Sequence, residues 1–166
     1  LGLATERIFL PLLRMVLPEI RDMHLPAAGA FHNLVIVSMR KEYPGHAQKV
    51  MSAIWGTGQI MFTKGVVVVD EDIDPHDLQE VLFRLTSNVD PRRDMMFVDG
   101  PLDVLDHASD RFAFGSKVGI DATRKNKPFD GFPREWPRDL VFPEAVLERI
   151  ADRWASYGLD GSAPLP

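Results

Sequence analysis

Short apolar runs along the chain predict buried β-strands. Residues 34–37 and 65–69 are continuous apolar segments rich in valine, a composition typical of strands covered on both faces. Weaker runs at residues 95–98 and 117–122 predict a third and a fourth strand. The run at 65–69 is the clearest of the four and ends abruptly in Asp70.

Between these runs, apolar residues recur every three or four positions, which predicts amphipathic helices. The first helix is expected to start at a Thr5 cap and reach Val16, and Pro11 either kinks it or opens a shorter helix near Leu10. Three further helices are expected: one from Pro44 to Gly56, one starting at an Asp74 cap followed by Pro75 with a buried stripe of Leu78, Val81, Leu82 and Leu85, and one from Glu144 through Tyr157.

The order of these elements predicts the fold class. Strands that alternate with helices need crossover connections, so we expect a three-layer α/β fold. Its central sheet is expected to be mostly parallel or mixed, with about four or more strands and helices on both faces. Residues 1–140 are expected to form this domain. Residues 141–166 are expected to form a carboxy-terminal helix and tail that act as an oligomerisation element, after an irregular proline-rich stretch at 124–143.

Composition excludes several classes of function. The chain has 166 residues and no cysteine, which rules out disulfides, iron–sulfur clusters and thiol catalysis. Its net charge of -5, with an acid-rich stretch followed by a basic one, is not a nucleic-acid footprint. No apolar run is long enough to cross a membrane. The chain starts at Leu1 without a methionine, so we expect a fragment of a longer protein.

No local motif predicts an active site. The sequence Gly56-Thr57-Gly58 follows a helix and lacks the third glycine of a dinucleotide loop, so it is interpreted as a helix end. The acidic residues at positions 70, 72 and 74 do not fit a calcium loop, which leaves a polar strand end or a cation or ligand site at the sheet edge. The histidines are dispersed and are interpreted as surface or structural residues: His24, His32, His46, His76 and His107.

Several segments together resemble one enzyme family. They are ATERIFLPLLRMVLPEIRDMHLP at 4–26, FTKGVVVVDEDID at 62–74 and GSKVGIDAT at 115–123, supported by PGHAQKVM, DPRRD and REWPR in the same order. The chain is similar to the carboxy-terminal domain of the UbiD-like decarboxylases, named for the polyprenyl-4-hydroxybenzoate carboxy-lyase. The resemblance covers almost the whole chain up to Leu140.

The resemblance implies a parent enzyme that decarboxylates aromatic or α,β-unsaturated acids. Its cofactor is implied to be prenylated FMN with a divalent metal (manganese) and potassium. In this family the flavin ligands, metal ligands and proton-transfer residues belong to the preceding domain, and none of those motifs occurs here. We therefore expect no catalytic, cofactor or metal residue in this chain and no activity of the chain alone.

The resemblance also implies two roles for the domain: it closes the substrate pocket and contributes to a dimer or hexamer. The expected partners are the preceding flavin domain and an aromatic acid of ubiquinone, menaquinone or phenolic-acid metabolism. A cytoplasmic location is implied, with the lipophilic substrate as a route to membrane association. A free-standing scaffold module and a small enzyme with a metal at residues 70–74 are the alternatives. The expected pocket-wall residues are Ile20, Thr63, Lys64, Gly115 and Lys117.

Overall fold

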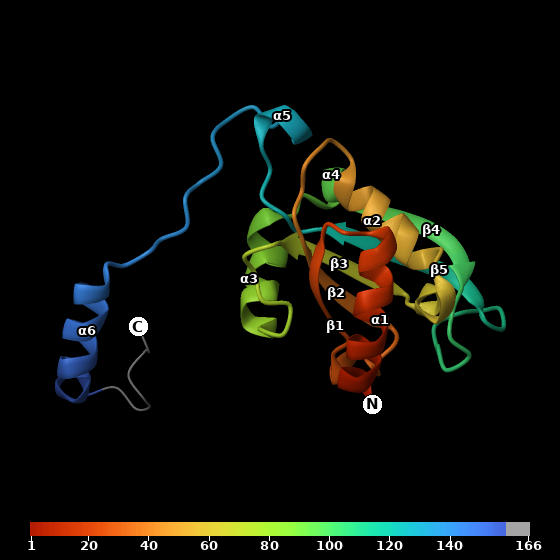
Figure 1. Ribbon diagram of the computed structural model, residues 1–166, viewed down its shortest axis with the longest axis horizontal. Helices are drawn as coiled ribbons and strands as arrows, with labels where there is room; N and C mark the ends of the chain where they lie inside the picture. The colour runs from red at the N-terminus through yellow and green to blue at the C-terminus, as the bar shows by residue number, and fades with distance from the viewer. Residues whose placement is uncertain (159–166) are drawn as a thin grey trace. The chain divides into compact units, whose positions relative to one another are not determined.

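The computed structural model describes residues 1–158, which divide into two compact units, residues 1–135 and a second unit that begins at Trp136. Residues 159–166, the end of the predicted carboxy-terminal segment, lie outside the described part. The first unit holds the sheet and most helices (Figure 1). Its elements are α1 (Gly2–Val16), β1 (Ile20–His24), η1 (Ala27–Gly29), β2 (Leu34–Met39), α2 (His46–Trp55), η2 (Gly58–Phe62), β3 (Gly65–Asp70), α3 (Leu78–Asn88), α4 (Pro91–Asp94), β4 (Met95–Pro101), β5 (Phe114–Asp121) and α5 (Lys127–Asp130).

The sheet is mixed, with strand order β1-β2-β3-β5-β4. The central strands β2, β3 and β5 are parallel, and the edge strands β1 and β4 each pair antiparallel with their neighbour. The predicted three-layer α/β fold is confirmed. The sequence did not predict β1, because only two of its five residues, Ile20 and Met23, are apolar and buried.

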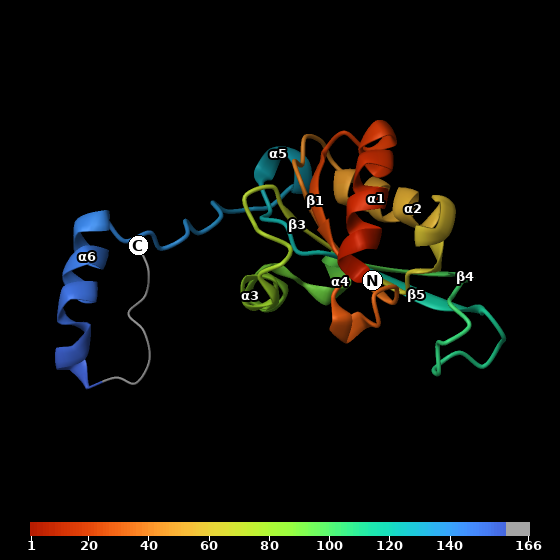
Figure 2. The same cartoon turned by 60° about the horizontal axis from the view of Figure 1, so that its bottom comes forward.

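Helices cover both faces of the sheet (Figure 2). One core cluster joins α1 and α2 to the side chains of Val35, Val37, Val66 and Val68. The other joins α3 to Ile36, Val67 and Val69. Successive residues of β2 and β3 thus point to opposite faces of the sheet. Both faces are buried under helices, which explains why the sequences of these strands are continuously apolar.

Two predicted helix starts are wrong. The helix α1 begins at Gly2, and Thr5 lies inside it, where its hydroxyl donates to the Leu1 carbonyl oxygen at 3.2 Å. The helix α3 begins at Leu78 under an Asp77 cap, not at Asp74. The Asp77 carboxylate accepts the amide protons of the second and third helical residues, whereas Asp74 accepts the His76 amide proton before the helix begins. Pro11 lies in the interior of α1.

Two predicted apolar stripes are only partly buried. On α3, Val81 is buried, whereas Leu78 and Leu82 are 44% and 55% exposed. The stripe expected on α1 is Ile8, Phe9, Leu12, Leu13 and Val16, of which Leu13 is buried, Phe9 is partly buried and the other three are exposed. Leu10, outside that stripe, also enters the core. A different side of α1 carries an exposed apolar face made of Ile8, Leu12, Met15 and Val16.

The second unit contains α6 (Glu144–Arg153) and η3 (Trp154–Tyr157). The predicted helix is therefore present. The apolar residues at helical spacing are partly buried: Val146, Leu147, Ile150, Ala151 and Trp154. The other residues of α6 and η3 are exposed. Within residues 1–158, no helix combines the length and apolar character that a membrane span needs.

Candidate functional site

Four of the five predicted pocket-wall residues lie at one edge of the sheet. Thr63 and Lys64 immediately precede β3, and Gly115 and Lys117 lie in the first half of β5. Because β3 and β5 are parallel and pair from Gly65 onward, the starts of both strands meet at this edge. We call it the β3–β5 edge.

Ile20 is not brought together with the other four. It pairs with Met39, the last residue of β2, and therefore lies toward the opposite end of the parallel strands. Its side chain is 1% exposed and belongs to the core beside α1 and α2. A direct contact of Ile20 with a ligand would need a rearrangement of this core.

Lys117 of β5 is hydrogen-bonded to the segment that precedes β3. Its side chain is 2% exposed, and its ammonium group donates to the carbonyl oxygens of Met61 and Thr63, the latter at 3.3 Å. Trp55 donates to the same Thr63 carbonyl at 3.1 Å. Burial lowers the pKa of Lys117 to about 8. The lysine holds the end of η2 in place and does not point into open solvent.

Lys64 anchors the connection between β4 and β5. Its ammonium group lies 2.9 Å from Asp106 Oδ1, and the Ser109 hydroxyl donates to Asp106 Oδ2 at 2.6 Å. The bond from Ser109 and then the bond from Lys64 lower the pKa of Asp106 to about 2. The same loop bounds the space at Gly115, where a Cβ atom would lie 2.6 Å from Ser109 Oγ. Gly115 therefore allows the close approach of the loop.

An apolar pocket of about 220 Å³ opens beside Thr63. Six of its eleven lining residues are aromatic or aliphatic, and five are polar or charged. The lining residues are Leu1, Thr5, Phe9, Leu25, Phe31, His32, Gln59, Ile60, Phe62, Thr63 and Asp103. Such a wall suits the apolar body of a small ligand.

The pocket wall includes strained backbone. Ala30 and Phe31 have φ angles of 51° and 63°, in the left-handed region that residues with a side chain rarely adopt. The conformation places the Phe31 ring in the pocket wall, 37% exposed. Strain of this kind persists where the surrounding structure fixes it, and it is common at ligand-binding sites.

The pocket does not fit a flavin mononucleotide by itself. Its lining residues include no lysine or arginine to pair with a phosphate, and Asp103 adds a negative charge. A phosphate or carboxylate would therefore need cations from outside this pocket.

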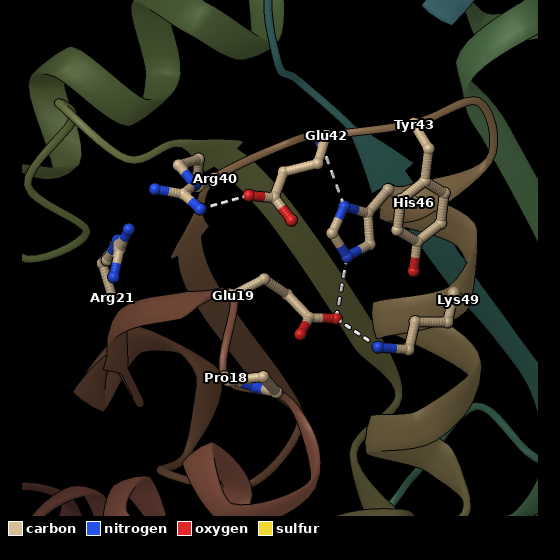
Figure 3. Close-up of a pocket in the computed structure, with 8 residues that line it drawn as sticks. All are labelled: Pro18, Glu19, Arg21, Arg40, Glu42, Tyr43, His46 and Lys49. Carbon is tan, nitrogen blue, oxygen red and sulfur yellow. Dashed lines mark hydrogen bonds and ion pairs between the residues drawn. The ribbon is translucent and has the colours of Figure 1, made fainter.

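A second, polar hollow lies at the opposite end of β2 (Figure 3). At its base, His46 Nε2 donates to Glu19 Oε1 at 2.9 Å, and His46 Nδ1 accepts the Glu42 amide proton at 3.1 Å. The Tyr43 ring stacks on the imidazole at 3.8 Å. Burial raises the pKa of Glu19, but bonds from Lys49, the backbone and His46 outweigh it, and the net pKa is lowered.

The bonding of His46 explains its role in the polar hollow. Both ring nitrogens are occupied within the protein, which fixes the tautomer and leaves no lone pair for a metal or a substrate proton. The sequence interpretation of His46 as a structural residue agrees with this geometry.

Comparison with known proteins identifies the family of this domain. Residues 1–122 match the model of the 3-octaprenyl-4-hydroxybenzoate carboxy-lyase C-terminal domain. An uncharacterized protein of Archaeoglobus fulgidus is 54% identical over 153 residues, which are 92% of this chain and 31% of that protein. The three-layer α/β domain is thus of the UbiD class. The chain belongs to the carboxy-lyase C-terminal domain family.

Solved structures agree with the assignment. The UbiD-class enzyme HmfF from Pelotomaculum thermopropionicum, in complex with FMN, has a TM-score of 0.75 and 29% identity over 94% of this chain and 33% of that one. The vanillic acid decarboxylase of Sedimentibacter hydroxybenzoicus has a TM-score of 0.71 and 27% identity over 87% of this chain and 30% of that one. The chain thus spans about a third of the length of these relatives.

Proposed function

We propose that this chain closes the substrate pocket of a UbiD-like decarboxylase and contributes to its assembly. The observation that carries the proposal is the family match over residues 1–122. The substrate class is an aromatic acid, such as a polyprenyl-4-hydroxybenzoate or a related quinone precursor. A lipophilic acid of this kind would bring the cytoplasmic enzyme to a membrane surface.

The cofactor is proposed to lie in the preceding domain of the same polypeptide, as prenylated FMN with manganese and potassium. HmfF, which extends well beyond the part that matches this chain, is in complex with FMN. The cation-poor lining of the apolar pocket supports this division, since the phosphate needs other residues. When bound, the flavin accepts electron density during decarboxylation.

The apolar pocket is proposed to hold the non-reacting body of the acid. Phe31, Ile60 and Phe62 exclude water from one side of it, which strengthens electrostatic interactions at the reacting carboxylate. Closure over the substrate then positions it without a catalytic group from this chain.

The exposed apolar face of α1 is proposed to contact the preceding domain. Ile8, Leu12 and Met15 follow helical spacing and are 63%, 53% and 80% exposed. A contiguous apolar face of this kind marks an interaction surface in a soluble protein. Its position on the helix that also lines the pocket fits a domain that closes over the substrate.

A pocket-filling substitution tests this function in the protein extended upstream by its own flavin domain. Gln59 is exposed and lines the pocket, so Gln59→Trp fills the pocket without disturbing the core. We expect KM for the aromatic acid to rise about tenfold, which corresponds to about 1.4 kcal/mol of lost binding. Steady-state decarboxylation kinetics measure it.

The matched control is Gln79→Trp, which places the same side chain at an exposed position on α3 outside this pocket. It is expected to leave KM and kcat unchanged. Equal kinetics for both variants would contradict a substrate role for the apolar pocket.

Assembly is proposed to involve the helical segment at residues 144–157. Its stripe of apolar residues at helical spacing suits a contact with a second copy of the chain. Truncation after Phe142 is expected to lower the oligomeric mass in light scattering by at least one dissociation step. An unchanged mass would rule out this segment as the main oligomer contact.

A further inference from the structure

Two histidines and three carboxylates meet where α1, the end of β1 and the loop after β3 come together. We call this group the His76 cluster; its members are Glu6, Asp22, His24, Asp74 and His76. The rings of His24 and His76 lie 4.4 Å apart. Their wide separation in the sequence hides this proximity, so no metal pair was predicted.

The buried end of the cluster has unsatisfied polar atoms. Glu6 is 2% exposed, and its Oε1 accepts from His24 Nδ1 at 2.8 Å and from the Leu25 amide at 2.6 Å. Among the described residues, Glu6 Oε2 and His76 Nε2 have no hydrogen-bond partner although both atoms are buried. An unpaired buried carboxylate oxygen is costly, so a ligand between these two atoms would stabilise the fold.

The spacing of the free atoms suits a metal ion. His76 Nε2 lies 4.0 Å from Glu6 Oε2 and 3.5 Å from Asp22 Oδ2. Ligand atoms about 2.1 Å from a tetrahedral zinc ion are about 3.4 Å from one another. Glu6, His24 and His76 each offer a ligand atom within 4.8 Å of the other two, and Asp22, Asp74 and His76 form a second such group around the same imidazole.

Neighbouring hydrogen bonds orient the side chains of the His76 cluster. Asp22 Oδ1 accepts the Met23 amide proton at 2.9 Å, which leaves Oδ2 toward His76. The His76 amide donates to Asp74 Oδ1 at 2.9 Å and fixes the turn that carries the imidazole. A hollow lined by Asp22, Asp74 and His76 connects the cluster to solvent. Arg7 and Arg21 also line this hollow as competing cations; Arg7 lies 3.9 Å from Asp22, and Arg21 donates to Glu71.

We propose that Glu6, His24 and His76 bind one divalent transition-metal ion of the zinc type, with Asp22 as a neighbouring carboxylate beside His76. Two imidazole nitrogens and one carboxylate oxygen are ligands that zinc accepts, and a ligating carboxylate is usually held by a further hydrogen bond, as Glu6 is by the Leu25 amide. The ion joins α1 to β1 and to the loop after β3. It is separate from the cofactor of the proposed decarboxylase and adds a metal site that the sequence did not predict.

Calorimetric titration of the metal-stripped 166-residue chain with zinc chloride tests the site at neutral pH. The unmodified chain is expected to bind one ion and to show a higher Tm with zinc present. His76→Ala and Glu6→Gln are each expected to weaken binding at least tenfold. Glu6→Gln keeps an oxygen that accepts from Leu25, so it retains the local fold if His76→Ala does not.

His107→Ala is the matched control, because it removes an exposed imidazole outside the cluster. Its zinc affinity is expected to equal that of the unmodified chain. No binding by the unmodified chain at millimolar zinc, or equal affinity in Glu6→Gln, would overturn the site. In either case the His76 cluster would be a set of ion pairs alone, and the proposed decarboxylase function would be unaffected.

Discussion

Between pH 8 and 10.5, the free energy of unfolding of the unmodified chain is expected to rise by about 3 kcal/mol relative to that of Lys117→Met. Burial lowers the pKa of Lys117 from the ordinary 10.5 to about 8. In this interval the unfolded chain holds a proton that the folded chain has released, so stability rises with pH. The size follows from about 1.4 kcal/mol for each unit of pKa shift. Methionine has a similar length and does not titrate.

Urea unfolding at several pH values measures the difference between the two proteins. The free energy of unfolding of the unmodified chain should rise relative to Lys117→Met as the pH increases from 8 to 10.5. Other groups titrate equally in both proteins and cancel in the difference. A difference that does not vary with pH would show that Lys117 keeps an ordinary pKa.

Lys49→Met provides a control of opposite sign. The hydrogen bond to Glu19 raises the pKa of Lys49. Its contribution is therefore present below pH 10.5 and is lost as the pH rises through the folded-state pKa. The difference between the unmodified chain and Lys49→Met should fall above pH 10.5, whereas the difference for Lys117→Met rises between pH 8 and 10.5.

Gly119→Ala is expected to lower the free energy of unfolding by about 2 kcal/mol, within the usual cost of overpacking a core. A Cβ atom at Gly119 would overlap Met51 Sδ and lie 3.1 Å from both Met96 and Trp55. Met51 is fully buried, so it has no free space into which to move. Chemical denaturation measures the effect as a lower midpoint with an unchanged slope.

Gly56→Ala is the matched control for this substitution. A Cβ atom at Gly56 would lie 3.5 Å from the Ser52 carbonyl oxygen, an ordinary contact, and the φ angle of -96° suits alanine. We expect a change below about 0.5 kcal/mol. Equal losses in both variants would mean that the packing at Gly119 is looser than the structure describes.

The central architecture was predictable because β2, β3 and α2 have strong and unambiguous patterns. Strand β1 was missed because Arg21 and Asp22 interrupt its apolar positions. The start of α3 was misplaced because Asp74 and Asp77 both offer a cap: Asp77 caps the helix, and Asp74 accepts the His76 amide proton in the turn before it. Three of the five stripe residues of α1, Ile8, Leu12 and Val16, are exposed, which a helical period alone cannot reveal.

Of the five expected pocket-wall residues, Thr63 is the one that lines the apolar pocket, and the pocket-wall role of all five stays a prediction. Thr63, Lys64 and Lys117 meet because the starts of parallel strands share an edge. The partner of Lys64 is Asp106, in a loop without a recognisable motif. Ring contacts such as that of His24 with His76 depend on three-dimensional packing, and no spacing in the sequence indicates them.

The central claim is that this domain acts on a substrate only together with the flavin domain. In the direct test, two proteins are incubated with prenylated FMN and manganese: the 166-residue chain, and the same chain extended upstream in its native polypeptide. We expect that only the extended protein retains flavin absorbance after desalting and decarboxylates an aromatic acid. Turnover by the 166-residue chain alone would contradict it.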